Sequence, residues 1–106
     1  AAHDALTGLV NRAEFERRLE AALEQGRAEG VAHVLCYMDL DRFKAVNDTC
    51  GHLAGDNLLR EIATLIRDQV RDSDVVARLG GDEFAMLLIG CPLEKARQIA
   101  DDVCAA

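Results

Sequence analysis

Two short runs of β-forming residues meet at a glycine pair, and this feature restricts the fold more than any other. The runs cover 75–79 and 83–89, and Gly80-Gly81-Asp82 lies between them. Glycine adopts the positive φ angles that tight turns require, so the pattern predicts an antiparallel hairpin. An antiparallel pair has a defined register, and this register decides which side chains share a face of the sheet.

Hydrophobic periodicity predicts the elements around the hairpin. Asn11 is a suitable N-cap for a helix from Arg12 to about Glu29, which Gly30 ends. The nearly continuous apolar run at 31–40 is typical of a strand buried on both faces. A glycine-containing loop is expected at 49–53. Further helices are expected at 42–48, 56–70 and 93–104.

Three strands interleaved with helices predict a layered α/β (α+β) sandwich with a mainly antiparallel sheet. The 106 residues suffice for one domain and one hydrophobic core. A single strand beside one hairpin makes a narrow sheet, so at least one further strand is expected beyond those that this sequence predicts.

The bulk composition excludes several classes of function. The net charge of −7 argues against nucleic acid as a partner, because phosphate contacts need a basic face. No apolar run approaches the length of a membrane span, and no signal peptide is evident, so a cytoplasmic location is expected. The four cysteines form no CxxC pair; they are interpreted as inert thiols, with a disulfide as the alternative.

Two acidic clusters carry the chemistry. Asp39 and Asp41 end the apolar strand, and Asp82 and Glu83 form the predicted hairpin tip. If the hairpin pairs beside the strand, Asp82 and Glu83 come close to Asp39, and these three carboxylates have no lysine to compensate them, an arrangement suited to Mg²⁺ and phosphate. The alternative is that both clusters are solvated strand ends and turn residues.

Polar residues between the two clusters are candidates for nucleotide binding. Lys44 is placed to face phosphate, and Asn47 and Asp56 carry groups that match a guanine edge. Each has a simpler alternative: a solvated lysine, a turn former and a helix N-cap. His52 lies in the predicted loop, and its chemistry alone favours neither a structural nor a binding role.

Three blocks of the sequence resemble the signature of GGDEF domains, the domains of diguanylate cyclases. GGDEF at 80–84 is the motif that gives the family its name, and DALTGLVNR at 4–12 resembles the family's opening DxLTGLxNR. The third block is similar to DxDxFKxxND..GH..GD, with DLDRFK at 39–44, ND at 47–48, GH at 51–52 and GD at 55–56. The blocks occur in the family's order, and the resemblance implies a ferredoxin-like, nucleotidyl-cyclase palm.

The resemblance also implies an activity, the condensation of two GTP molecules into cyclic di-GMP by a dimer with two Mg²⁺ ions, or Mn²⁺, per active site. Asp39, Asp82, Glu83 and the Leu40 carbonyl would hold the metal, and Asp82 would activate the 3′-hydroxyl, with Glu83 beside it. The remaining substrate contacts implied by the family motif are the phosphate-binding backbone at Phe43 and Lys44, the guanine-binding Asn47 and Asp56, and the substrate neighbour His52.

A second motif of the family lies just before the hairpin. Arg71-Asp72-Ser73-Asp74 has the RxxD form, and the resemblance implies an inhibitory site where Arg71 and Asp74 bind the product cyclic di-GMP. The alternative is a charged helix end followed by a turn.

The resemblance predicts that this single domain at 1–106 is incomplete at its C-terminus. Family domains continue through further strand and helix, including a basic segment that contacts the triphosphate, and usually follow a sensor or receiver domain. The activity of the fragment by itself is therefore left open. The alternatives to a cyclase are a GGDEF module that senses GTP or cyclic di-GMP, and a ferredoxin-like interaction domain with acidic surface clusters.

Overall fold

The computed structural model describes residues 2–40 and 43–105. Asp41 and Arg42, part of the acidic motif and the start of the predicted short helix, lie outside the described residues, as do the side chains of Phe43 and Cys104. The helices and strands follow in the order α1 (Arg12–Glu29), β1 (Val34–Asp39), α2 (Phe43–Cys50), α3 (His52–Gln69), β2 (Val75–Gly80), β3 (Glu83–Leu88) and α4 (Leu93–Ala105).

The three strands form an antiparallel sheet in the order β1-β3-β2, so the second strand of the hairpin is central. The predicted hairpin is confirmed: β2 pairs with β3, and the register shifts between Arg78 and Gly80, next to the turn. Gly80 and Gly81 have φ angles of 151° and 50°, which L side chains adopt only with strain. The predicted α+β fold with an antiparallel sheet is therefore confirmed.

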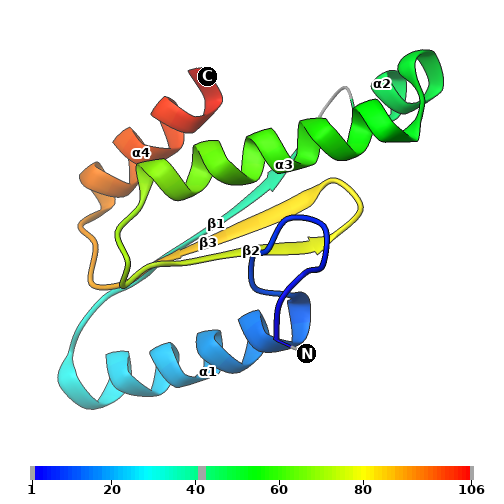
Figure 1. The fold of residues 1–106 in the computed structure, drawn as a ribbon. Helices are drawn as coiled ribbons and strands as arrows, with labels where there is room; N and C mark the ends of the chain where they lie inside the picture. Colours follow the sequence, from blue (N-terminus) through cyan, green and yellow to red (C-terminus); the bar gives the residue numbers. More distant parts are fainter. Residues whose placement is uncertain (1, 41–42, 106) are drawn as a thin grey trace.

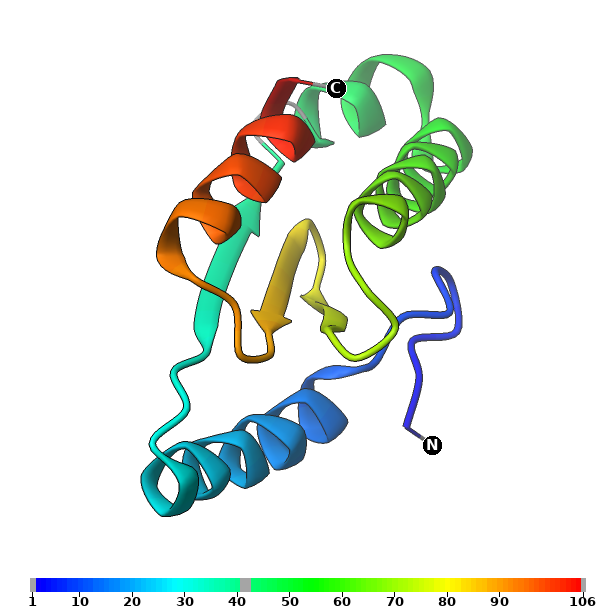
Figure 2. The same cartoon turned by 90° about the vertical axis from the view of Figure 1, so that its left-hand side faces the viewer.

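Helices cover the sheet on two sides (Figure 1). α3 and α4 lie over one face and α1 over the other, and the end-on view in Figure 2 shows the sheet between them. Successive side chains of β3 point to opposite faces of the sheet. Phe84 and Met86 pack in the core beneath α3 and α4, whereas Ala85 and Leu87 pack in the core beside α1.

The prediction that the strand at 31–40 is buried on both faces is wrong. β1 lies at an edge of the described sheet, and its residues alternate between half-buried and exposed. The physical reason is the position of α1, which packs mainly on β2, so Leu35 and Tyr37 on the same face stay partly exposed. Tyr37 is 65% exposed.

Local signals at the ends of α1 behave as predicted. The Asn11 side chain accepts a hydrogen bond from the Glu14 N–H at 2.9 Å, which satisfies one of the unpaired donors of the first turn. Gly30 ends the helix in the left-handed region, with φ at 68°.

The prediction of a loop at 49–53 is wrong. α2 continues to Cys50 and α3 begins at His52, so Gly51 alone, with φ at 90°, separates the two helices. Asp56 accordingly lies inside α3 and is not its N-cap. The two helices pack against each other, and this packing extends both helices into the predicted loop.

None of the described helices is long and apolar enough to cross a lipid bilayer. Cys36, Cys50 and Cys91 are free thiols, and Cys91 lies in the core beneath α3 and α4.

Burial along α3 gives a test of the core. Leu59→Ala is expected to lower the free energy of unfolding by about 2–5 kcal/mol, because Leu59 is 1% exposed and its loss leaves a cavity. Leu53→Ala is the matched control on the same helix, since Leu53 is 74% exposed and should change stability by about 0.5 kcal/mol or less. Urea denaturation of both variants measures the difference, and equal losses would contradict this core.

Candidate functional site

The strand register brings one residue of each acidic motif together. Asp39, the last residue of β1, lies directly opposite Glu83, the first residue of β3. Directly opposed residues in an antiparallel pair have Cβ atoms roughly 5 Å apart and point to the same face. Two exposed carboxylates thus lie side by side at the end of the sheet where the hairpin turns.

Asp82 and Leu40 extend this pair through the backbone. The Leu40 N–H donates to the Asp82 carbonyl at 3.3 Å, so the turn of the hairpin is held against the end of β1. No three His, Cys, Asp or Glu side chains within 2–40 and 43–105 lie close enough to hold a metal ion, so the predicted convergence of three carboxylates is not formed there.

The donors that are present nevertheless fit a hard cation. Mg²⁺ is commonly held by one or two carboxylates and completes its octahedron with water and substrate phosphate. Asp39 and Glu83 supply two carboxylates on adjoining strands, and Asp82 and the Leu40 backbone lie next to them. A binding site completed by the substrate itself requires no third carboxylate in the free protein.

Arg12 supplies a positive charge that the sequence analysis did not place here. A guanidinium nitrogen of Arg12 lies 3.6 Å from a Glu83 carboxylate oxygen, and Nε donates to the Leu79 carbonyl at 3.3 Å. The only sequence feature that could have indicated this position for Arg12 is its place at the end of the opening motif, in Asn11-Arg12. An open pocket of about 340 Å³ lies at this position, and it is lined by Arg12, Tyr37, Met38, Asp39, Leu79, Glu83 and Phe84.

Arg78 joins the N-terminal segment to the hairpin tip. Its guanidinium donates to the Asp4 carboxylate at 3.1 Å and to the Gly81 carbonyl at 3.0 Å. Burial alone would raise the pKa of Asp4, but hydrogen bonds from Thr7 and the charge of Arg78 outweigh it, so the pKa lies below its ordinary value. Asp4 and Thr7 of the opening motif therefore have a structural role.

The predicted nucleotide-binding residues are distributed over α2 and the start of α3. Asn47 lies on α2, and His52 and Asp56 lie on α3. The Asn47 side-chain oxygen is buried and accepts no hydrogen bond from the described residues, whereas buried polar atoms are normally paired. Phe43 and Lys44 open α2, where backbone N–H groups lack helical partners.

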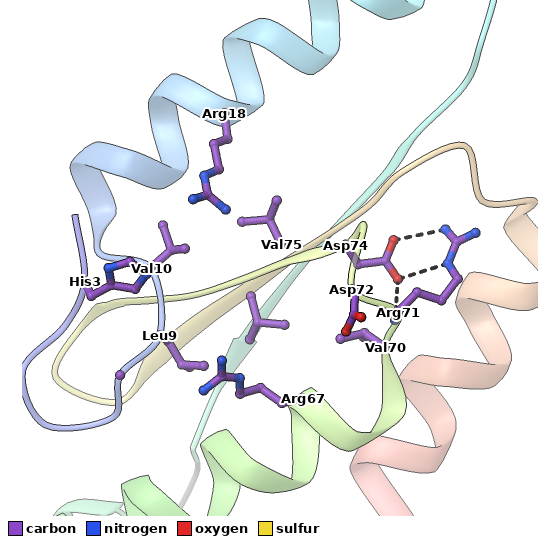
Figure 3. Close-up of a pocket in the computed structure, with 12 residues that line it drawn as sticks. His3, Leu9, Val10, Arg18, Arg67, Val70, Arg71, Asp72, Asp74 and Val75 are labelled. Atoms are coloured by element: carbon purple, nitrogen blue, oxygen red, sulfur yellow. Dashed lines mark hydrogen bonds and ion pairs between the residues drawn. The ribbon is translucent and has the colours of Figure 1, made fainter.

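Arg71 and Asp74 form a compact pair at the other end of β2 (Figure 3). The guanidinium of Arg71 donates to Asp74 at 3.0 Å and to the Ile89 carbonyl at 2.6 Å. Asp74 also accepts from the backbone N–H groups of Arg71 and Ile89, at 3.0 Å each, and its side chain is 1% exposed. The pair is thus more than a charged helix end, because it ties the start of β2 to the end of β3.

Burial and hydrogen bonding act in opposite directions on Asp74. Burial would raise the pKa of its carboxyl group, but the hydrogen bonds from Arg71 and Ile89 outweigh it and hold the pKa below the ordinary value of 3.8. The hydrogen bond to Asp74 and the negative charge of that carboxylate raise the pKa of Arg71.

Comparison with known proteins identifies the group to which these features belong. The family model described as "Diguanylate cyclase, GGDEF domain" matches residues 1–106. Over 106 residues the chain is 55% identical to the probable diguanylate cyclase DgcE of Escherichia coli. The matched region is 100% of this chain and 10% of that relative.

Solved structures agree with the family match. The GGDEF domain of TpbB (YfiN) from Pseudomonas aeruginosa is similar with a TM-score of 0.90 and 51% identity, over 97% of this chain and 60% of that one. The GGDEF domain of DgcB from Caulobacter crescentus, solved in complex with c-di-GMP, has a TM-score of 0.94 and 33% identity, with the same two coverages of 97% and 60%. The chain therefore spans less than two thirds of these solved chains.

The Asp74 hydrogen bonds give a pH-dependent prediction. At pH 7, Asp74→Asn should lower the free energy of unfolding by about 2 kcal/mol, because charge-assisted hydrogen bonds to a buried carboxylate are lost. Asp74 has a lowered pKa when folded, so its stabilisation is complete above the ordinary value of 3.8 and disappears as the pH falls through the folded-state pKa.

The difference between the native chain and Asp74→Asn should therefore shrink below about pH 4. Urea midpoints between pH 7 and pH 2 measure it. Asp72→Asn is the control, because Asp72 is exposed two residues away and should give no such pH-dependent difference. A difference that stays constant down to pH 2 would contradict the assignment.

Proposed function

Because the chain belongs to the GGDEF family of diguanylate cyclases, we propose that it binds GTP and contributes to joining two GTP molecules into cyclic di-GMP and pyrophosphate. The observation that carries the proposal is the register of β1 and β3, which sets Asp39 opposite Glu83 beside the Asp82 turn. These residues belong to two separate motifs, and the sheet brings them to one place.

In this proposal, Asp39, Asp82, Glu83 and the Leu40 carbonyl hold two Mg²⁺ ions, or Mn²⁺, together with the triphosphate. Bound metal would lower the pKa of the attacking hydroxyl and neutralise charge on the phosphates. Arg12 lies 3.6 Å from Glu83 and would orient that carboxylate while the site is free.

The guanine would be bound between α2 and α3. The Asn47 oxygen is a buried acceptor without a described partner, and guanine offers N–H donors from its ring and exocyclic amine. In this proposal Asp56 accepts from the same edge, His52 lies beside the substrate, and the phosphates take hydrogen bonds from the backbone at Phe43 and Lys44.

The reaction requires two copies of the domain that face each other. The Asp82 carboxylate takes the proton of a 3′-hydroxyl, and the oxygen attacks the α-phosphorus of the GTP on the partner domain. A P–O bond forms and the bond to pyrophosphate breaks; the same step in the other direction closes the ring. Each domain holds one GTP, so activity requires a homodimer.

Regulation is proposed at Arg71 and Asp74. This pair would bind cyclic di-GMP as an inhibitory product, since guanidinium binds phosphate and the guanine edge well. Because the chain covers a small part of its curated relatives, a sensor or receiver domain in the same protein is proposed as the source of the input signal.

A direct assay tests the proposal. The full-length protein that carries this domain is incubated with GTP and Mg²⁺, and pyrophosphate and cyclic dinucleotide are quantified. Turnover supports a cyclase, whereas GTP or cyclic di-GMP binding without turnover would replace it with the sensing module. Absence of any Mg²⁺-dependent nucleotide binding would contradict both and leave an interaction domain.

Asp82→Ala should reduce turnover by at least about 100-fold, because a positioned general base contributes on this order. The fold should persist, since the Asp82 side chain makes no hydrogen bond or ion pair with residues in 2–40 or 43–105. Asp68→Ala, an exposed carboxylate on α3, is the control with unchanged turnover. Retained activity in Asp82→Ala, with normal circular dichroism, would refute its role.

Arg71→Ala should raise the concentration of cyclic di-GMP needed for half-maximal inhibition by about tenfold or more, because charge-assisted hydrogen bonds to the product are lost. The measurement is initial turnover at increasing product concentration. Arg60→Ala removes an exposed arginine of α3 and serves as the control. Inhibition that is unchanged in Arg71→Ala would limit the pair to its structural role.

A further inference from the structure

A second pocket lies along β2, away from the Asp39–Glu83 pair. It is open to solvent, has a volume of about 220 Å³, and lies between α1, α3, the N-terminal segment and the segment before β2. Leu9, Val10, Val75 and Val76 line it, and Arg18 and Arg67 reach it from the two helices. Figure 3 shows these two arginines pointing toward one another across the pocket, one from α1 and one from α3.

The charge on Arg67 is available for a ligand. In the described part of the chain Arg67 forms no ion pair, and the residue is exposed. A guanidinium presents five N–H donors in a planar fork, which matches the oxygens of phosphate.

Arg18 is only partly neutralised by its neighbour. Its Nε donates to the Glu14 carboxylate at 2.7 Å, but Arg17 binds the same carboxylate through two further hydrogen bonds. Two guanidinium groups therefore share the Glu14 carboxylate, and Arg18 binds it through Nε alone, which leaves its other guanidinium nitrogens for a ligand. Hydrogen bonds from Arg17 and Arg18 lower the pKa of Glu14 to about 2, so the carboxylate itself stays ionised at neutral pH.

The two acidic residues beside the pocket differ in effect. The Asp74 carboxylate is buried and takes hydrogen bonds from Arg71 and Ile89, so its charge is compensated. Asp72 is exposed and lines the pocket, so it opposes an anion there. The guanidinium of Arg71 is directed to Asp74 and Ile89, away from Arg18 and Arg67 in Figure 3.

From these charges we propose that the pocket between α1 and α3 binds a small phosphate-class anion, inorganic phosphate or diphosphate, through Arg18 and Arg67. The volume of about 220 Å³ is below the range of sites for drug-sized molecules and suits an anion with its waters. Two cations on opposite walls favour a ligand with oxygens on both sides. The site is separate from the Asp39–Glu83 pair, and Arg71 and Asp74, the proposed product-binding pair, line the same pocket. Phosphate binding at Arg18 and Arg67 does not depend on cyclase activity.

Binding is tested with the purified chain by isothermal titration calorimetry, with phosphate and pyrophosphate as probes at low ionic strength. Arg67→Gln and Arg18→Gln should each weaken binding by about tenfold or more, because each removes charge-assisted hydrogen bonds to the anion. Arg60→Gln is the matched control, since Arg60 lies on α3 and its side chain binds only Asn57 among the residues that the structure describes. Asp72→Asn should strengthen binding, because it removes the opposing charge.

The nature of the occupant is settled by a third probe. GMP that binds as tightly as phosphate, with the same loss in Arg67→Gln, identifies the site as one for the phosphate of a nucleotide, whereas weaker GMP binding identifies free phosphate or diphosphate. Binding that is equal in the native chain, Arg67→Gln and Arg60→Gln would overturn the site. So would the absence of binding in a chain whose thermal unfolding is cooperative, and neither outcome bears on GTP turnover.

Discussion

The pairing of β3 with both of its neighbours is the constraint on which the rest of the molecule depends. β3 is the only strand of the described sheet that lies between two other strands, and Phe84, Met86 and Leu88 are fully buried on one face. A slip of one residue against β1 would turn these side chains to the other face. The hydrophobic core therefore fixes the register that sets Asp39 opposite Glu83. Packing energy is what holds two like charges side by side.

Two arginine side chains, Arg78 and Arg12, also hold the hairpin tip by joining it to the N-terminal part of the chain. Arg78 joins the Gly81 carbonyl to Asp4, across 74 residues of sequence, and Arg12 reaches Leu79 and Glu83. The Arg78–Asp4 pair is less than a quarter exposed, so solvent screens it less than a surface pair. A turn that contains two glycines would otherwise be conformationally free. These contacts explain why the opening motif and the glycine turn occur in one domain, since the first restrains the second.

Sequence reasoning succeeded where the signal was local. The cap at Asn11, the stop at Gly30 and the hairpin at Gly80-Gly81 each depend on a few adjacent residues, and each was predicted. It failed where neighbours decide the outcome. The apolar run at 31–40 gives no sign that β1 is an edge strand, because that depends on where α1 packs. The role of Arg12 at Glu83 was not predicted for the same reason, since it joins residues 71 positions apart.

The arrangement of the two motifs along β2 limits how they can influence each other. Arg71 and Asp74 precede β2, and the glycine turn follows it, so a strand of six residues, about 20 Å, separates them. A ligand bound to Arg71 cannot contact a nucleotide at the hairpin tip of the same domain. In the proposed enzyme, inhibition must therefore act on how two domains are held relative to each other, or through the hairpin itself. The Arg71 contact with the Ile89 carbonyl joins the motif to the end of β3, the strand that begins with Glu83. A ligand that draws Arg71 away would break its hydrogen bond to the Ile89 carbonyl and leave Asp74 to join the two strands there through the Ile89 N–H, while Arg78 and Arg12 hold the other end.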